Sequence, residues 1–147
     1  MGECHTPVCE ALVILKSQQD QLEGCPTDCF SSLLAKLLKV DTIPFMLYTP
    51  NGGPLELAGF EHEQYTICTK YFHTRFFRIE SIDKENCCAK ISLLRPVDLE
   101  GYSATSICEV AYLERTKICT VVDLNCFCAV QCLDVELMRK IIIEPKW

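Results

Sequence analysis

Twelve cysteines in a chain of 147 residues constrain the fold more than any other feature of the sequence. Small domains this rich in cysteine are usually secreted and held together by disulfides, because the cytosol keeps thiols reduced. Residues 1–30, however, show neither the basic start nor the apolar core of a secretory signal, so we expect a protein made without one. A chain of this length also buries an ordinary hydrophobic core. The cysteines are therefore not needed merely to make the domain fold.

Composition and charge narrow the possible functions. Twenty acidic residues against fourteen basic ones give a net charge of −6, and the basic residues are scattered along the chain. A nucleic-acid partner would require a basic patch, so no nucleic acid is expected. No apolar run is long enough to predict insertion into a membrane. The apolar fraction of 49% is consistent with faces that other copies of the chain cover.

The spacing of apolar residues divides the chain into segments. Residues 1–40 show helical spacing, with helix starts at Thr6 and Thr27, so a pair of short helices is expected. Residues 41–133 are rich in β-branched and aromatic residues, which predicts an antiparallel β body. The predicted strands are 42–49, 74–82, 87–95, 107–113, 117–124 and 126–133.

Two turns and a tail complete the predicted architecture. Turns are expected at 51–54 and at 114–117, where polar and glycine-rich stretches separate β-rich runs. For the tail, residues 134–147, a short helix is preferred over an edge strand at 141–143. The whole chain, 1–147, is predicted to be one α+β, mainly β domain. Its short N-terminal helices would precede an antiparallel β-sandwich or barrel-like domain.

The cysteines in the predicted strands differ in where they point. Side chains two apart in a strand share a face, so Cys126, Cys128 and Cys132 would form a row on one surface. Members of such a row are poorly placed to bond each other, so each needs a partner on another strand or another chain. Cys87 and Cys88 are neighbours and would point to opposite sides, one into the core and one outward.

Other cysteines are judged by their local setting. Cys25 and Cys29 flank the second helix start, where backbone dipoles lower the pKa of a thiol and speed exchange. Cys108 and Cys119 lie in apolar alternations, where inert core packing and cross-linking are equally open. Cross-linking is the expected role of nine thiols: Cys4, Cys9, Cys25, Cys29, Cys87, Cys88, Cys126, Cys128 and Cys132.

Zinc binding and thiol catalysis are the alternatives to cross-linking. Structural zinc sites usually combine two C-x2-C knuckles, whereas the spacings here are C-x4-C, C-x3-C, CC, C-x-C and C-x3-C. A zinc-stabilised interaction module is therefore the first alternative, and a thiol–disulfide oxidoreductase, which needs C-x-x-C, comes after it. Because no phosphate loop, nucleophile elbow or paired carboxylates appear, no enzyme, no cofactor and no resident metal are expected.

Six segments carry a recognisable pattern, at 25–30, 41–45, 76–80, 87–94, 108–110 and 122–133. The last is the most specific, because its run Cys-Phe-Cys-Ala-Val-Gln-Cys does not follow from composition alone. In these segments the chain resembles the spore coat Y/Z family, the cysteine-rich outer-coat proteins of bacterial endospores, which include exosporium basal-layer proteins.

The resemblance implies a structural protein of the outer coat or exosporium. It implies ring-shaped homo-oligomers that tile into a two-dimensional lattice, hardened by disulfides between subunits, with other spore coat or exosporium proteins as further partners. It also implies synthesis in the mother-cell cytoplasm and oxidation when that cell lyses, in keeping with the absence of a signal peptide. Residues 1–24 and 134–147 lie outside the matching segments, so the layer and the paralogue stay open.

Overall fold

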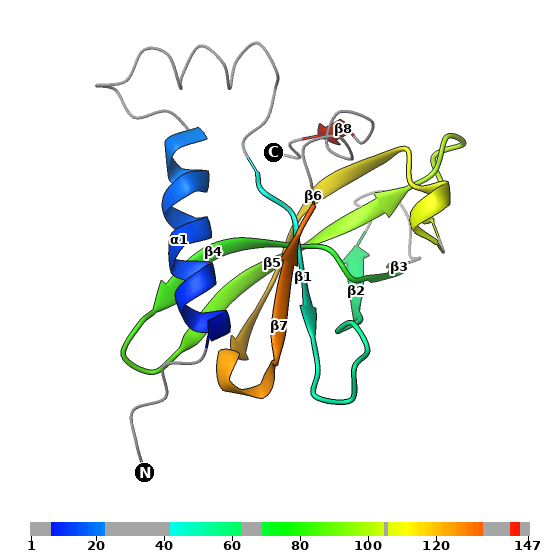
Figure 1. Ribbon diagram of the computed structural model, residues 1–147. Helices are drawn as coiled ribbons and strands as arrows, with labels where there is room; N and C mark the ends of the chain where they lie inside the picture. Colours follow the sequence, from blue (N-terminus) through cyan, green and yellow to red (C-terminus); the bar gives the residue numbers. More distant parts are fainter. Residues whose placement is uncertain (1–6, 23–41, 63–68, 105, 134–141, 145–147) are drawn as a thin grey trace.

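The computed structural model describes residues 7–22, 42–62, 69–104, 106–133 and 142–144 (Figure 1). These ranges contain one α-helix, eight strands and two short 3-10 turns. In chain order the elements are α1 (Pro7–Leu22), β1 (Phe45–Tyr48), β2 (Leu57–His62), β3 (Thr69–Thr74), β4 (Phe77–Asp83), β5 (Cys88–Val97), η1 (Ile107–Glu109), β6 (Tyr112–Asp123), η2 (Leu124–Cys126), β7 (Ala129–Cys132) and β8 (Ile142–Glu144).

The strands form two sheets of unequal size. The larger sheet has the order β7-β1-β4-β5-β6-β8, and β2 pairs with β3 in a separate two-stranded sheet. Among the described strands, the pairings are antiparallel except for β6 with β8, which is parallel. One helix and mostly antiparallel strands confirm the predicted α+β, mainly β class.

Helix α1 packs its apolar stripe on one face of the larger sheet (Figure 1). Val8, Leu12 and Leu15 recur at helical spacing and are almost completely buried. They share a core cluster with strand residues that alternate toward the helix, as the period of two requires. These strand residues are Phe45, Leu47, Phe77, Ile79, Ala89, Ile91 and Leu93.

A buried polar side chain also fixes the position of the helix. Gln19 is 1% exposed, and its Nε2 donates a hydrogen bond to the Ile79 carbonyl at 2.8 Å. Its Oε1 accepts a hydrogen bond from the Ile43 backbone N–H at 3.2 Å. Both polar ends of the amide are therefore satisfied, and the helix is connected to β4 and to the chain that enters β1.

Phe72 on β3 anchors the small β2–β3 sheet in the main core, and Leu57 on β2 packs against the same core. Phe72 is 2% exposed and belongs to the main core cluster. Its ring lies so close to Gly59 on β2 that a Cβ at that position would collide with it. Phe60 and Tyr71 contact each other with tilted rings whose centroids are 4.9 Å apart, and both remain largely exposed. The pair thus presents an aromatic face to solvent.

Strand β6 is longer than predicted. It runs continuously through 114–117, so the predicted turn there is wrong. The polar residues of this stretch are accommodated by β5: the Thr116 hydroxyl donates to the Leu93 carbonyl at 2.7 Å, and Arg95 forms an ion pair with Glu114 at 2.8 Å. The strand predicted at 107–113 is also wrong in its first part, which forms η1.

Other predicted elements have mixed outcomes. The turn at 51–54 is confirmed, with Gly52 at φ +89° and its N–H donating to the Thr49 carbonyl at 2.9 Å. Strand β2 was not predicted, and the predicted strand 74–82 shares only Thr74 with β3 while it covers most of β4. The preference for a helix in the tail is wrong at 142–144, which forms β8 alongside β6. The second predicted helix lies outside the described residues.

Candidate cross-linking site

Eight cysteines lie in the described part of the chain, and they divide by exposure. Cys9 and Cys87 are buried, and Cys88 is half-buried. The exposed ones are Cys108, Cys119, Cys126, Cys128 and Cys132. Three other predicted cross-linking residues, Cys4, Cys25 and Cys29, lie outside the described residues, so their role stays a prediction.

The prediction that Cys126, Cys128 and Cys132 form a row on one strand is only partly correct. Cys126 ends the η2 turn, in which Asp123 acts as N-cap: its Oδ1 accepts the Asn125 N–H at 3.0 Å. Because of this capped turn, β7 begins only at Ala129, and Cys126 does not continue the strand. All three thiols are exposed, as expected for cross-linking residues, but Cys126 lies in η2, Cys128 in the connection that follows it and Cys132 in β7.

Cys128 immediately precedes the edge strand β7, and Cys132 is its last residue. The Cys128 N–H donates to the Tyr48 carbonyl at 2.9 Å, and its Sγ lies 3.2 Å from the Thr49 carbonyl oxygen. Cys132 is opposite Phe45 in the ladder with β1, on the face that carries α1. Partial burial raises the pKa of the Cys132 thiol above its ordinary value. At a given pH a raised pKa leaves less thiolate, so this thiol exchanges more slowly than one with the ordinary pKa.

Two thiols whose role was left open are exposed. Cys119 lies in the second half of β6, where half-buried and exposed positions alternate, and it shares the exposed set with Lys117, Val121 and Asp123. The two charged residues at this spacing were the sequence signal that the face is solvated. Cys108 is exposed in η1. Core packing does not describe either residue.

Cys87 and Cys88 divide between interior and surface as predicted. Cys87 is 4% exposed, while Cys88 is half-buried on β5 opposite Asp123. The physical reason differs from the prediction, because Cys87 lies in the turn before β5 and has a positive φ of 52°. That conformation, rather than strand alternation, accompanies the burial of its thiol.

The Cys9 thiol is the most strongly perturbed of the described cysteines. It is 5% exposed in the first turn of α1, and burial raises its pKa to about 11. A hydrogen bond and electrostatic interaction with Cys87 raise this pKa further, and the charges of Glu10 and Asp83 act in the same direction. A helix N-terminus favours the thiolate, but here burial and these neighbours outweigh it.

Five of these cysteines gather at one end of the molecule, which we call the cysteine end: Cys9, Cys87, Cys88, Cys126 and Cys128. The start of α1, the β4–β5 turn and the β6–β7 connection meet there (Figure 1). The Leu124 N–H donates to the Cys87 carbonyl at 2.8 Å, which holds the last two together. Chain segments far apart in sequence therefore bring buried and exposed thiols to the same end.

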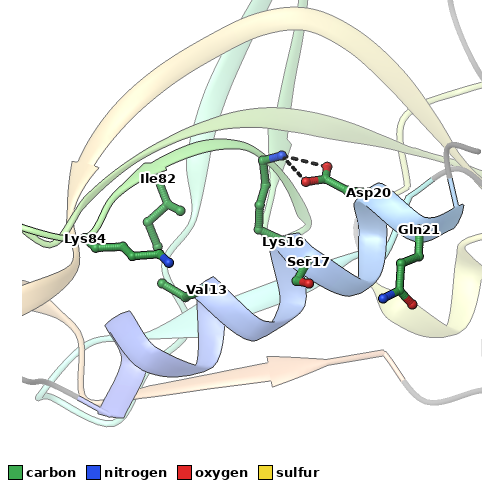
Figure 2. Close-up of a pocket in the computed structure, with 7 residues that line it drawn as sticks. All are labelled: Val13, Lys16, Ser17, Asp20, Gln21, Ile82 and Lys84. Atoms are coloured by element: carbon green, nitrogen blue, oxygen red, sulfur yellow. Dashed lines mark hydrogen bonds and ion pairs between the residues drawn. The ribbon is translucent and has the colours of Figure 1, made fainter. Parts of the chain in front are cut away.

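Two hollows of similar size lie on the described surface. One, of about 430 Å³, lies between α1 and the end of β4, and on its helix side Lys16 forms an ion pair with Asp20, four residues further along α1, at 2.6 Å (Figure 2). The other, of about 450 Å³, includes Tyr71, His73 and Arg75 from β3 and the residue that follows it. Neither of the two is lined by a cysteine. Neither hollow is therefore a thiol site, although the first is bordered by Lys84, whose carbonyl oxygen lies 3.9 Å from the Cys87 Sγ.

The described residues contain no group of three or more histidine, cysteine, aspartate or glutamate side chains placed to hold one metal ion. Among the described residues, no helix has the length and apolar character needed to cross a membrane.

Alkylation of Cys9 should depend steeply on pH. With a pKa of about 11 rather than the ordinary 9.0, this thiol stays protonated up to a higher pH. At pH 8 about one molecule in a thousand then carries the reactive thiolate. In a chain carrying Cys4→Ser, the iodoacetamide rate at Cys9 should rise about tenfold per pH unit from 7 to 9.5. The same chain unfolded in urea is the control, and its alkylation rate should level off near pH 9. If the rate for the folded protein also levels off below pH 9, the pKa of Cys9 is not raised.

The chain was compared with known proteins. It matches the family model described as Spore coat protein Z over residues 1–135, a range that contains all twelve cysteines. A curated relative, Spore coat protein Z of Bacillus subtilis (strain 168), is 37% identical over 139 residues, which cover 89% of this chain and 90% of the relative. No solved structure matches the chain.

Proposed function

The chain belongs to the spore coat protein Z family, and we propose that it is a non-enzymatic subunit whose copies assemble into an ordered, disulfide-cross-linked coat layer. Membership of this family supports a structural role in the spore coat. To this structural role the proposal adds a ring-shaped homo-oligomer, its arrangement in a two-dimensional lattice and disulfide bonds between subunits. It favours the coat over the exosporium, because both matches name the coat, and it includes other coat proteins as partners.

The observation that carries the proposal is the distribution of exposed thiols. They occur on separate elements: Cys108 on η1, Cys119 on β6, and Cys126 and Cys128 around the β6–β7 connection. A subunit with one reactive site gives dimers, whereas several sites on different elements allow each copy to bond several others. Tethering at several points turns modest contacts into a nearly irreversible assembly. This arrangement suits a cross-linked layer better than a soluble module.

Strand β7 is a suitable docking edge. In the described part of the chain it pairs only with β1, so its other edge offers backbone groups to a second copy. If two copies of β7 pair antiparallel about Val130, Cys128 of each copy lies opposite Cys132 of the other. Directly opposite residues have Cα atoms about 4.5–5.5 Å apart, within the range that a disulfide spans. Docking would thus bring together two thiols that cannot bond within their own strand.

Oxidation of the purified, reduced protein tests the proposal. With glutathione disulfide, a non-reducing gel should show a ladder and material too large to enter, and dithiothreitol should collapse both to one band. Electron microscopy of the concentrated protein should show rings or sheets. A monomer band whose thiols still react with iodoacetamide after oxidation would overturn the proposal.

A further inference from the structure

Two buried thiols from distant parts of the sequence meet at the cysteine end. Cys9 in the first turn of α1 is 5% exposed, and Cys87 in the β4–β5 turn is 4% exposed. Their side chains are in hydrogen-bonding contact, and both belong to the main core cluster. Each is therefore shielded from thiols of other copies and lies beside a thiol of its own chain.

The backbone at Cys87 adds an independent observation. Among the described residues, it is the one non-glycine with positive φ, at 52°. Asp83 shapes this turn, since its Oδ1 accepts the N–H groups of Glu85 at 3.0 Å and Asn86 at 3.3 Å. Glycine would adopt such a conformation more easily than cysteine. A cysteine kept in an unfavourable conformation, with its sulfur inside, points to a use for the thiol.

We propose that Cys9 and Cys87 form a disulfide within one chain under oxidising conditions, with a peroxide as oxidant. One thiolate attacks a peroxide oxygen, which gives a sulfenic acid and hydroxide. The second thiol then attacks that sulfur, so that the S–S bond forms and the sulfenic oxygen leaves as water. In sum, two thiols and one hydrogen peroxide give one disulfide and two waters. Hydrogen peroxide is small enough to reach thiols that are too buried for a protein partner.

This bond would prepare the subunit for the layer without joining it to a neighbour. It fastens the start of α1 to the β4–β5 turn and closes a loop of roughly 80 residues, which restricts the unfolded chain. The inference stands apart from the proposed function, because no second copy takes part. It also separates the nine predicted cross-linking cysteines: this pair bonds internally, and the exposed ones remain for other subunits.

Peptide mapping tests the bond in the full chain. Trypsin leaves Cys4 with Cys9 in the peptide 1–16, and Cys87 with its neighbour in the peptide 85–90. The test therefore uses a chain carrying Cys4→Ser and Cys88→Ser, treated with hydrogen peroxide at pH 9, alkylated and digested without reductant. The two peptides should appear joined, in a yield that is unchanged when the protein is diluted tenfold.

Thermal unfolding supplies a second readout. Oxidation should raise the midpoint by about 10 °C, the gain expected for a loop of this length in a domain of this size. A Cys87→Gly variant keeps the turn conformation and should lose the rise, whereas Cys119→Ser should keep it. The inference is overturned if either thiol is found alkylated after peroxide treatment, if the joined peptides become scarcer on dilution, or if Cys87→Gly still shows the rise.

Discussion

Replacing either Cys128 or Cys132 with serine is expected to remove most of the disulfide-linked dimer that forms first on mild oxidation. In the proposed antiparallel β7 pairing, each bond joins Cys128 of one copy to the partner's Cys132, so either change deletes both bonds of the interface. The double variant should therefore lose no more of the dimer than either single variant does. Non-reducing gels of dilute protein, sampled early in oxidation, measure the loss.

A mixing experiment distinguishes this interface from other arrangements. Copies carrying Cys128→Ser retain Cys132, and copies carrying Cys132→Ser retain Cys128, so a mixture of the two should recover one bond and with it the dimer. Cys126→Ser is the matched control, because it changes an exposed thiol on η2 and should leave the dimer in place. If the mixture gives no dimer, or the double variant keeps it, the β7 pairing is wrong.

Removing the ring of Phe77 should have the largest effect on folding. This side chain is fully buried on β4, opposite Leu93 in the ladder, with its ring centroid 6.2 Å from that of Phe45. A buried Phe→Ala change costs about 3–5 kcal/mol, because transfer energy is lost and a cavity remains. Domains are typically stable by about 5–15 kcal/mol, so Phe77→Ala should lower the free energy of unfolding severely. Urea unfolding in reductant measures it.

The control for this prediction is another phenylalanine in the same molecule. Phe60 is 61% exposed and contacts Tyr71 at a centroid distance of 4.9 Å. Phe60→Ala should cost no more than about 1 kcal/mol, as for most surface changes. If both variants lose the same free energy of unfolding, the core does not lie between α1 and the larger sheet.

Local signals predicted the parts of the fold that local interactions determine. The helix that starts at Pro7 follows from its apolar spacing, and the turn at 51–54 follows from its glycines. The continuity of β6 could not be predicted, because the polar stretch 114–117 is stabilised by contacts with β5 that are distant in sequence. The same holds for β8, whose place beside β6 is a tertiary pairing.

The cysteine groups were predictable only where alternation applies. The contrast between Cys87 and Cys88 was predicted, but the positive φ of Cys87 gives no signal in a single sequence. The exposure of Cys119 could have been derived from charged residues two and four positions away on the same face. The contact between Cys9 and Cys87 joins the helix to a turn, and no spacing rule indicates it.

Exposed thiols should bond between subunits, whereas Cys9 and Cys87 should bond within one chain. The most direct test mixes equal amounts of reduced light and ¹⁵N-labelled chain carrying Cys4→Ser and Cys88→Ser, lets them assemble and oxidise, and maps linked peptides by mass spectrometry. Trypsin leaves Cys119 and all three cysteines around β7 in the peptide 118–139. Disulfide-linked pairs of this peptide should be light–heavy hybrids in about half of cases, as random pairing requires, while links between Cys9 and Cys87 should join light to light or heavy to heavy. Hybrids at the buried pair, or none in the 118–139 pairs, would contradict the account.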